Sequence, residues 1–344
     1  MDTTGPVTAV DLEPFRFGGE RDRAQVGELI DAACRSTGFL AVTGHGVPLD
    51  IVERTFAVTT EFFDRPLEDK LRFRLEDKAA NRGYFAEGTE ALSYSLGKES
   101  PPDLFEAFNV GWDVPEAEVD EYVAPVRATY FAPNPWPDAP RSFRPTWLEY
   151  WKAMDALGHT LMSAFAVALG LPADHFAPTL DRNISVMRAI NYERRDPSAP
   201  ALDGQMRMGP HSDYGSLTIL AADRVPGLQI HTAAGWADAM PPEGGFLVNL
   251  GDLLAEWTND RWQSTVHRVV PPPMGEEGPA RRRSIAWFQQ PNYDARIEVL
   301  PTCTSADDPP RYPPVSAGDH LMAKLMGPKD LRPSEVDPQF QRRL

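Results

Sequence analysis

The chain has 344 residues, a formal net charge of −16 and a sequence pI near 4.9. An acidic surface repels phosphate backbones and anionic lipids, which argues against nucleic acid and membranes as partners. Hydrophobic residues make up 42% and charged residues 24%, with 34 prolines against 25 glycines, and this usage is typical of a folded, loop-rich protein.

Two features that the sequence lacks bear on location and chemistry. Residues 1–10 carry neither a basic segment nor an apolar run of the kind that directs secretion, and no run of 18 apolar residues occurs. We therefore expect a cytoplasmic protein. Cys34 and Cys303 are the only cysteines, too few for a disulfide framework or a thiolate zinc site.

The N-terminal part predicts two helices with a strand between them. Apolar residues recur every three or four positions in residues 22–36, which predicts an amphipathic helix. Residues 38–47 indicate a strand broken by a glycine turn, and residues 49–64 indicate a second helix. His45 lies between two glycines, so we interpret it as a turn residue and not as a ligand.

The rest of the chain changes from loops to a long helix and then to strands. Residues 80–142 are rich in glycine, proline and aromatic residues, and the apolar spacing of residues 143–170 predicts one long helix. Short β-type runs follow at residues 185–192, 216–221, 227–231, 245–250, 264–270 and 284–289. Such runs favour a barrel or sandwich, and the lack of glycine-rich phosphate loops argues against nucleotide-binding α/β folds. We expect a mainly β fold with flanking helices.

A candidate metal site begins in the run Met208–Leu220. Residues i and i+2 of an extended strand point to the same side, so one strand can supply both His211 and Asp213 as ligands. His267, in a second strand-like run, would complete a set of two histidines and one carboxylate. That set fits oxygen-activating Fe(II). Catalytic zinc also takes three protein ligands, so the ligand count alone does not decide the metal.

Three arginines and a serine begin the strand-like run 281–290. Period-2 geometry places Arg282 and Ser284 on one face of the strand, and Arg281 and Arg283 on the other. The planar fork of an arginine and a serine hydroxyl together suit a carboxylate. A solvated basic run is the alternative interpretation of the same pattern.

The order of these motifs resembles a known family. His211-x-Asp213, then His267-Arg-Val269, then Arg282-x-Ser284 are similar to the motifs of the Fe(II)- and 2-oxoglutarate-dependent oxygenases of the isopenicillin N synthase-like superfamily, and residues 82–84 and 92–98 resemble its bacterial members. The resemblance extends over nearly the whole chain through residues 38–48, 82–84, 92–98, 226–229, 248–252 and 311–314.

The resemblance implies a double-stranded β-helix, or jelly roll, with Fe(II) held by His211, Asp213 and His267. It also implies that 2-oxoglutarate chelates the iron while its distal carboxylate binds Arg282 and Ser284, with Tyr192 reaching the same carboxylate. One structural unit is expected, made of an N-terminal region packed on the core (1–140), a long helix (141–180), the jelly-roll core (181–300) and a C-terminal cap (301–344).

The implied activity is that of a dioxygenase that oxidises a C–H bond of a small molecule and releases succinate and CO2. Hydroxylation, desaturation and cyclisation are all open as outcomes, in bacterial specialised metabolism such as antibiotic biosynthesis. The alternatives are an isopenicillin N synthase-like oxidase without 2-oxoglutarate, an ethylene-forming variant, a zinc hydrolase and a binding protein with a vestigial site. Aromatic residues that either line the substrate pocket or pack in the core are Tyr84, Phe85, Tyr94, Phe105, Phe108 and Phe288.

Overall fold

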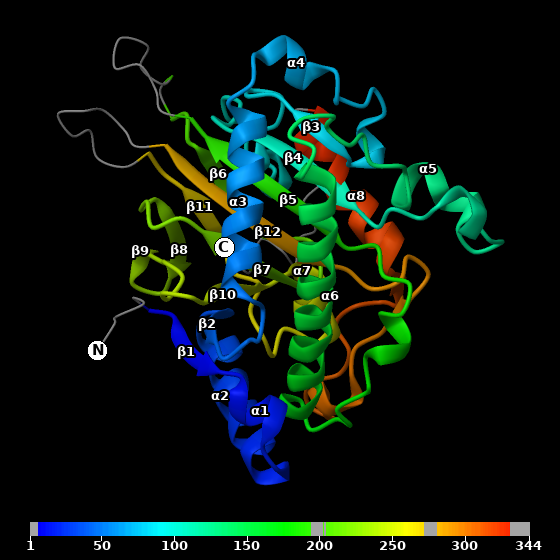
Figure 1. Cartoon of the computed structure of the whole chain (residues 1–344). Helices are drawn as coiled ribbons and strands as arrows, with labels where there is room; N and C mark the ends of the chain where they lie inside the picture. The colour runs from blue at the N-terminus through cyan, green and yellow to red at the C-terminus, as the bar shows by residue number, and fades with distance from the viewer. Residues whose placement is uncertain (1–5, 194–201, 203, 272–280, 331–344) are drawn as a thin grey trace.

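The computed structural model describes residues 6–193, 202, 204–271 and 281–330. Within these ranges, two larger β-sheets form the centre of the molecule, and helices cover the outside (Figure 1). The mainly β architecture with flanking helices, predicted from the alternation of short apolar runs and turns, is confirmed. Residues 331–344 of the predicted C-terminal cap lie outside the described residues.

The larger sheet forms one side of the candidate site. In the described part of the chain its eight strands follow the order β1-β2-β10-β7-β12-β5-β4-β3, with β1 parallel to β2 and the other neighbours antiparallel. In that order the bounds are Thr8–Asp11, Phe39–Thr43, Phe246–Leu250, Leu217–Ala222, Arg282–Gln289, Val186–Tyr192, Glu106–Gly111 and Gly83–Phe85.

The smaller sheet is antiparallel throughout and brings two distant parts of the sequence together. Its strand order is β6-β11-β8-β9, with bounds Met208–His211, His267–Val269, Leu228–Thr232 and Gly235–Asp238. The last residue of β6, His211, lies opposite the first residue of β11, His267. Two further short strands, β13 (Arg296–Ile297) and β14 (Val315–Ser316), pair with each other.

The helices confirm the three helical segments expected from apolar spacing. The α-helices of the described chain are α1 (Glu13–Phe17), α2 (Glu20–Ser36), α3 (Leu49–Phe63), α4 (Leu67–Leu71), α5 (Arg127–Tyr130), α6 (Phe143–Ala168), α7 (Asp252–Trp257) and α8 (Ala317–Asp330). Short 3-10 helices are η1 (Lys78–Ala80), η2 (Leu92–Leu96), η3 (Glu116–Glu118), η4 (Ala124–Val126), η5 (Ala177–Thr179) and η6 (Pro301–Cys303). Among these residues no helix is both long and apolar enough to cross a membrane.

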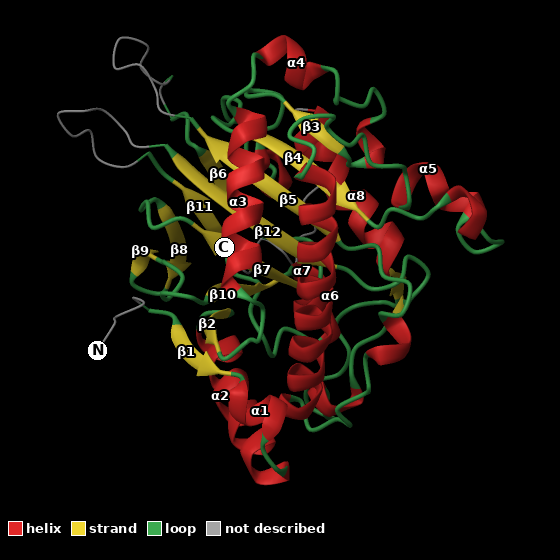
Figure 2. Cartoon of the chain, viewed as in Figure 1, coloured by secondary structure: helices red, strands yellow, loops and turns green. Residues whose placement is uncertain are grey.

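Helices α3 and α6 cover the outer face of the larger sheet (Figure 2). The indole of Trp147 on α6 donates a hydrogen bond to Thr59 Oγ1 on α3 at 3.1 Å, and the ring of Trp151 packs edge-on against Trp287 of β12 at 4.6 Å. Trp287 lies on the outer face of β12, beneath the helices. Because side chains alternate along a strand, Phe288 and Ser284 lie on its inner face. The inner face is therefore free to build a cavity.

Candidate metal centre

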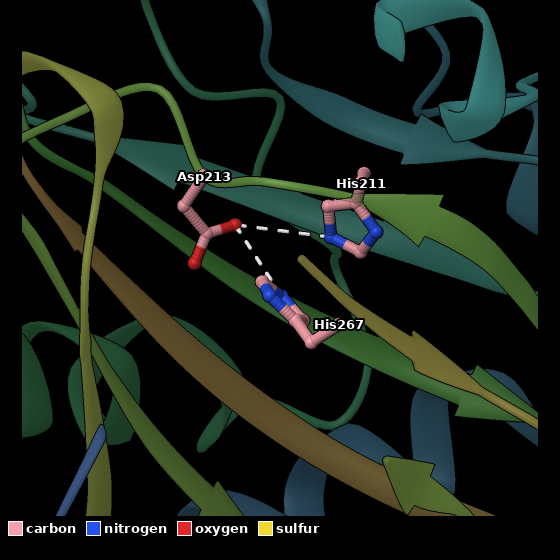
Figure 3. A group of neighbouring side chains, drawn as sticks. All are labelled: His211, Asp213 and His267. Atoms are coloured by element: carbon pink, nitrogen blue, oxygen red, sulfur yellow. Dashed lines mark ion pairs between the residues drawn. The ribbon is translucent and has the colours of Figure 1, made fainter. Parts of the chain in front are cut away.

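The three predicted ligand residues lie together between the two sheets (Figure 3). His211 and His267 are cross-strand neighbours whose rings lie 4.3 Å apart, and the Nε2 atom of each lies 3.8 Å from Asp213 Oδ1. One potential ligand atom from each residue lies within 4.8 Å of the others. One ion can therefore reach all three.

The structure corrects one detail of how the ligands are supplied. Strand β6 ends at His211, so Asp213 lies in the segment that follows and not on the same extended strand. Ser212 still points away, since its hydroxyl donates to Asp252 Oδ2 at 3.1 Å. Likewise, the sequence pattern predicted a strand from residue 264, but β11 begins at His267. The Ser264 hydroxyl donates a hydrogen bond to Asp252 Oδ1 at 2.6 Å, so this residue does not join the strand.

Backbone carbonyls fix the orientation of both imidazoles. His211 Nδ1 lies 2.8 Å from the oxygen of Gly209, and His267 Nδ1 lies 3.1 Å from the oxygen of Thr265. A carbonyl oxygen only accepts, so each Nδ1 carries the proton and donates it. The Nε2 lone pairs are then directed at the space beside Asp213, which is the arrangement of metal-binding histidines.

The protein holds Asp213 through one of its two oxygens. Oδ2 accepts hydrogen bonds from Thr218 Oγ1 at 2.5 Å and from Asn249 Nδ2 at 2.6 Å. Thr218 belongs to β7 and Asn249 to β10, so the larger sheet positions a ligand that follows a strand of the smaller one. Oδ1 is left facing the histidines.

Burial favours the form of His211 that can bind a cation. His211 and His267 are 5% and 7% exposed, and burial, with the neighbouring His267, lowers the pKa of His211 to about 4. A neutral imidazole offers a lone pair to a metal, whereas an imidazolium does not. Two imidazole nitrogens and one carboxylate oxygen on one side of an ion fit the facial triad of non-haem Fe(II).

The inner face of β12 carries a buried arginine and serine that point into the same cavity. Arg282 and Ser284 are each 2% exposed, so the interpretation as a solvated basic run is wrong for them. Arg282 Nη1 lies 3.5 Å from Ser284 Oγ, while Arg282 Nε is buried and has no hydrogen-bond partner among the described residues. An unsatisfied buried guanidinium nitrogen fits a carboxylate such as that of 2-oxoglutarate.

Tyr192 lies opposite Arg282 on the neighbouring strand β5. The Arg282 guanidinium carbon lies 5.1 Å from the centre of the Tyr192 ring, and the Tyr192 hydroxyl lies 3.8 Å from the sulfur of Met208. Burial raises the pKa of Tyr192, so its hydroxyl keeps its proton and remains a donor.

The outer face of β12 has a structural role, as the period of two predicts. Arg281 Nε donates to Asn191 Oδ1 at 2.7 Å, and Arg283 Nη1 donates to Thr60 Oγ1 on α3 at 2.7 Å. The two arginines therefore anchor the strand and face away from the cavity.

The cavity has a volume of about 130 Å³ and takes its walls from both sheets and from α8. Of the six aromatic candidates its lining includes Phe288. The structure places the other five elsewhere: Tyr84, Phe85, Tyr94, Phe105 and Phe108.

Specific contacts show where four of those five aromatic side chains pack instead. The Tyr84 hydroxyl donates to buried Glu106 at 2.5 Å, and the Phe108 ring packs against Phe62 of α3 at 5.0 Å. Phe85 and Phe105 pack against the guanidinium of Arg188, and Tyr94 lies on η2. His45, interpreted from the sequence as a turn residue, uses both ring nitrogens within the turn after β2 and with Gly244.

Sequence reasoning missed several polar residues of the cavity wall. Arg188 shares the inner face of β5 with Tyr192 at a spacing of four, so the period of two could have revealed it. No local signal marks Glu90, because it lies in an irregular segment before η2. Further members of the lining that were not anticipated are Asn81, Asn109, Tyr214, Thr218, Asn249, Gln290, Leu321 and Leu325.

Comparison with known proteins gives the same picture over almost the full length. Residues 184–291 match the family model described as the 2OG-Fe(II) oxygenase superfamily, and residues 7–139 match the one described as non-haem dioxygenase in morphine synthesis N-terminal. A 2-oxoglutarate-Fe(II) type oxidoreductase of Emericella nidulans is 30% identical over 93% of this chain and 89% of its own length.

Two further relatives cover similar shares. Validamycin A dioxygenase of Streptomyces hygroscopicus subsp. limoneus is 31% identical over 93% of this chain and 86% of its own length. The solved structure of a Neurospora crassa protein in complex with α-ketoglutarate (2-oxoglutarate) and thymine is 31% identical, covers 93% of this chain and 96% of that one, and superposes with a TM-score of 0.81. With the fold, the donor set and these similarities in agreement, the chain belongs to the 2OG-Fe(II) oxygenase superfamily.

Proposed function

We propose that His211, Asp213 and His267 hold Fe(II) and that Arg282, Ser284 and Tyr192 bind the distal carboxylate of 2-oxoglutarate. The observation that carries this assignment is the convergence of three ligand atoms within 4.8 Å in a cavity that also contains a buried guanidinium with an unsatisfied nitrogen. The enzyme itself is a 2-oxoglutarate-dependent dioxygenase, and it oxidises a small molecule with release of succinate and CO2.

Iron, O2 and 2-oxoglutarate supply the oxidising chemistry in this family, and the protein's residues arrange it. The carbonyls of Gly209 and Thr265 keep the imidazoles in the ligating tautomer, and Thr218 and Asn249 keep one oxygen of Asp213 aimed inward. Apolar side chains form much of the cavity wall and exclude water, and the charge of Arg282 offsets that of a bound dicarboxylate.

The first test is succinate formation that depends on Fe(II) and 2-oxoglutarate. His211→Ala should abolish both Fe(II) binding and succinate formation, because it removes one of three ligands. His175→Ala is the matched control, since His175 is exposed and lies outside the cavity. Wild-type turnover in the His211→Ala variant would contradict the site assignment.

A second measurement separates this proposal from an isopenicillin N synthase-like oxidase. Addition of 2-oxoglutarate to the anaerobic Fe(II) protein should produce a metal-to-ligand charge-transfer band. If no band forms and substrate oxidation is retained, the result would favour the oxidase. Arg282 would then be assigned to a carboxylate of the substrate. Ethylene among the products would indicate the ethylene-forming variant.

The biological setting is also part of the proposal: bacterial specialised metabolism, such as antibiotic biosynthesis, in the cytoplasm. One supporting observation is the relative from Streptomyces named for validamycin A. The net charge of −16 argues against nucleic acid as a partner. Deletion of the gene in its host should remove a metabolite that has gained one oxygen or lost two hydrogens, as seen by comparative mass spectrometry.

A further inference from the structure

A buried ion pair faces the part of the cavity that the proposed cofactor residues do not occupy. Arg188 on β5 donates through Nη2 to Glu90 Oε2, and both residues line the cavity. Their side chains are only 11% and 4% exposed. Neither residue belongs to the proposed iron ligands or to the carboxylate-binding group.

The register of the sheet separates this ion pair from the 2-oxoglutarate residues. Arg188 lies opposite Ala286 of β12, whereas Tyr192 lies opposite Arg282. Four residues along a strand correspond to about 13 Å. Arg188 therefore belongs to the opposite end of the inner face, where a substrate can lie while 2-oxoglutarate occupies the Arg282 end.

Aromatic rings hold the guanidinium of Arg188 in place. Its central carbon lies 5.3 Å from the centre of the Phe85 ring and 5.1 Å from that of Phe105. Contact with aromatic faces stabilises a cation and limits its movement. Arg188 is thus held in place by its neighbours and is not a mobile surface side chain.

The ion pair is monodentate, which leaves bonding capacity on both partners. Arg188 Nε is buried, but Arg188 Nη1 and Glu90 Oε1 are not fully buried and make no hydrogen bond within the described ranges of the chain. Each partner of the ion pair therefore keeps one group, a donor on Arg188 and an acceptor on Glu90, for a further hydrogen bond, and both residues line the cavity. Asn109, opposite Arg188 on β4, adds an uncharged amide whose Nδ2 donates to Asn81 Oδ1 at 2.8 Å.

This arrangement discriminates by charge. A carboxylate that approaches Arg188 also meets Glu90, and an ammonium or guanidinium group that approaches Glu90 also meets Arg188. Like charges brought together in an interface are strongly unfavourable. A neutral planar group with a carbonyl oxygen beside an N–H accepts from Nη1 and donates to Oε1 without such a cost.

We propose that Arg188 and Glu90 are specificity-determining residues that select a neutral substrate bearing an amide-like group, such as a carboxamide, a lactam or a ureide. The inference rests on the proposed function, because it assigns the substrate class of that same site. The amide-like group anchors the molecule, and the C–H bond to be oxidised belongs to another part of it.

Three probes of the same size and shape but different charge test the selection: benzamide, benzoate and benzamidine. Each is titrated by calorimetry into the metal-free full-length protein. Benzamide should bind at least about tenfold more tightly than either charged probe, equivalent to a difference of about 1.4 kcal/mol. Tighter binding of benzoate or benzamidine, equal binding of all three, or no binding of any would overturn the proposal.

Two variants, each of which neutralises one partner of the ion pair, should change the ranking of probe affinities in opposite directions. Glu90→Gln leaves the charge of Arg188 uncompensated and should raise the affinity for benzoate about tenfold or more, while Arg188→Gln should do the same for benzamidine. Glu149→Gln, in an exposed ion pair with Arg54, is the matched control and should leave the ranking unchanged. Unchanged rankings in both folded variants would contradict the selection by charge.

The outcomes separate this proposal from the proposed function. Thermal unfolding tests whether each variant folds. If a variant does not fold, the ranking of the three probe affinities for the wild-type protein alone decides whether the proposal stands. The probes need no iron, so a failed ranking with intact succinate formation refutes only the substrate class. An intact ranking without succinate formation refutes only the assigned reaction.

Discussion

At the residue scale, Asp213 divides its two oxygens between the protein and the proposed iron. Thr218 and Asn249 both donate to Oδ2, so the carboxylate is oriented before a metal binds. Such outer hydrogen bonds commonly contribute a factor of about 10 to 100 in metal affinity. The side chains that set the affinity therefore include residues that do not touch the metal.

Thr218→Val should lower the affinity for Fe(II) by about 10- to 100-fold, because it removes a hydroxyl donor from Asp213 at nearly constant volume. Competition with a chelator of known affinity measures the change. Thr160→Val is the control, since its hydroxyl donates to the Ala156 carbonyl within α6, away from the cavity. Equal affinities in the two variants would mean that the hydroxyl does not orient the ligand.

Arg282→Lys should raise the KM for 2-oxoglutarate about tenfold or more, because an ammonium cannot reproduce the planar fork of donors. Succinate formation at varied 2-oxoglutarate concentration gives the constant. Arg283→Lys, one position along on the outer face of β12, should leave it near the wild-type value. A larger effect at Arg283 than at Arg282 would reverse the assignment of the two faces.

At the scale of elements, Asp103 connects the irregular segment before β4 to β6, the strand that carries the proposed ligand His211. Its Oδ2 accepts from the backbone N–H of Leu92 and its Oδ1 from that of Gly209, each at 2.8 Å. Burial raises the pKa of Asp103 to about 7, although both hydrogen bonds oppose the rise. The segment that carries Glu90 is thereby joined to the strand that carries His211.

The raised pKa predicts how stability depends on pH. Between about pH 4 and pH 7 the folded chain keeps the Asp103 proton while the unfolded chain has lost it, so this residue's contribution falls as pH rises. Below and above that window the contribution is constant. Urea unfolding of the metal-free protein should show that Asp103→Asn removes this slope, whereas Asp174→Asn, at an exposed turn, retains it. Identical slopes in wild type and Asp103→Asn would contradict the prediction.

Local periodicity accounts for much of what could be predicted at this scale. Helices α2, α3 and α6 follow from apolar residues at helical spacing, and the two faces of β12 follow from the period of two. The same rule failed at Asp213, because β6 ends two residues earlier and tertiary hydrogen bonds then orient the carboxylate. The three candidate ligands were predicted from the order of several motifs, because no single motif was specific enough.

Neighbours across the sheets could not be predicted from the sequence. Thr218, Asn249 and Glu90 reach the cavity only because strand order places their segments beside it. Nor could composition separate Phe288, which lines the cavity, from Phe108, which is fully buried among the aromatic rings of α3 and α6. Both residues are apolar and lie on strands, and only the face they occupy differs.

At the scale of the whole molecule, the proposed iron site joins the two sheets. His211 and His267 come from the smaller sheet, while the partners of Asp213 come from β7 and β10 of the larger one. Asp252 adds a second link, since it accepts hydrogen bonds from Ser212, next to the ligands, and from Lys324 of α8. A metal bound here couples parts of the chain that are distant in sequence.

Removal of the metal should therefore lower global stability. A ligand that binds only the folded state stabilises it by about 2.7 kcal/mol at a concentration of 100 times its Kd. Anaerobic Fe(II) should raise the Tm of the wild-type protein, and a chelator should reverse the rise. The Tm of His211→Ala should respond to neither addition, and a similar response in both proteins would place the stabilising ion elsewhere.

The alternation of faces along β12 also constrains how this gene can evolve. If one codon were lost or gained so that β12 shifted by one residue in the sheet, its two faces would be reversed. Arg282 and Ser284 would then face outward, and Trp287 would face the cavity. A point substitution changes one side chain, whereas such a frame-preserving insertion or deletion reverses the whole strand. Descendants of this sequence should accordingly vary in the composition of β12 while its length stays the same.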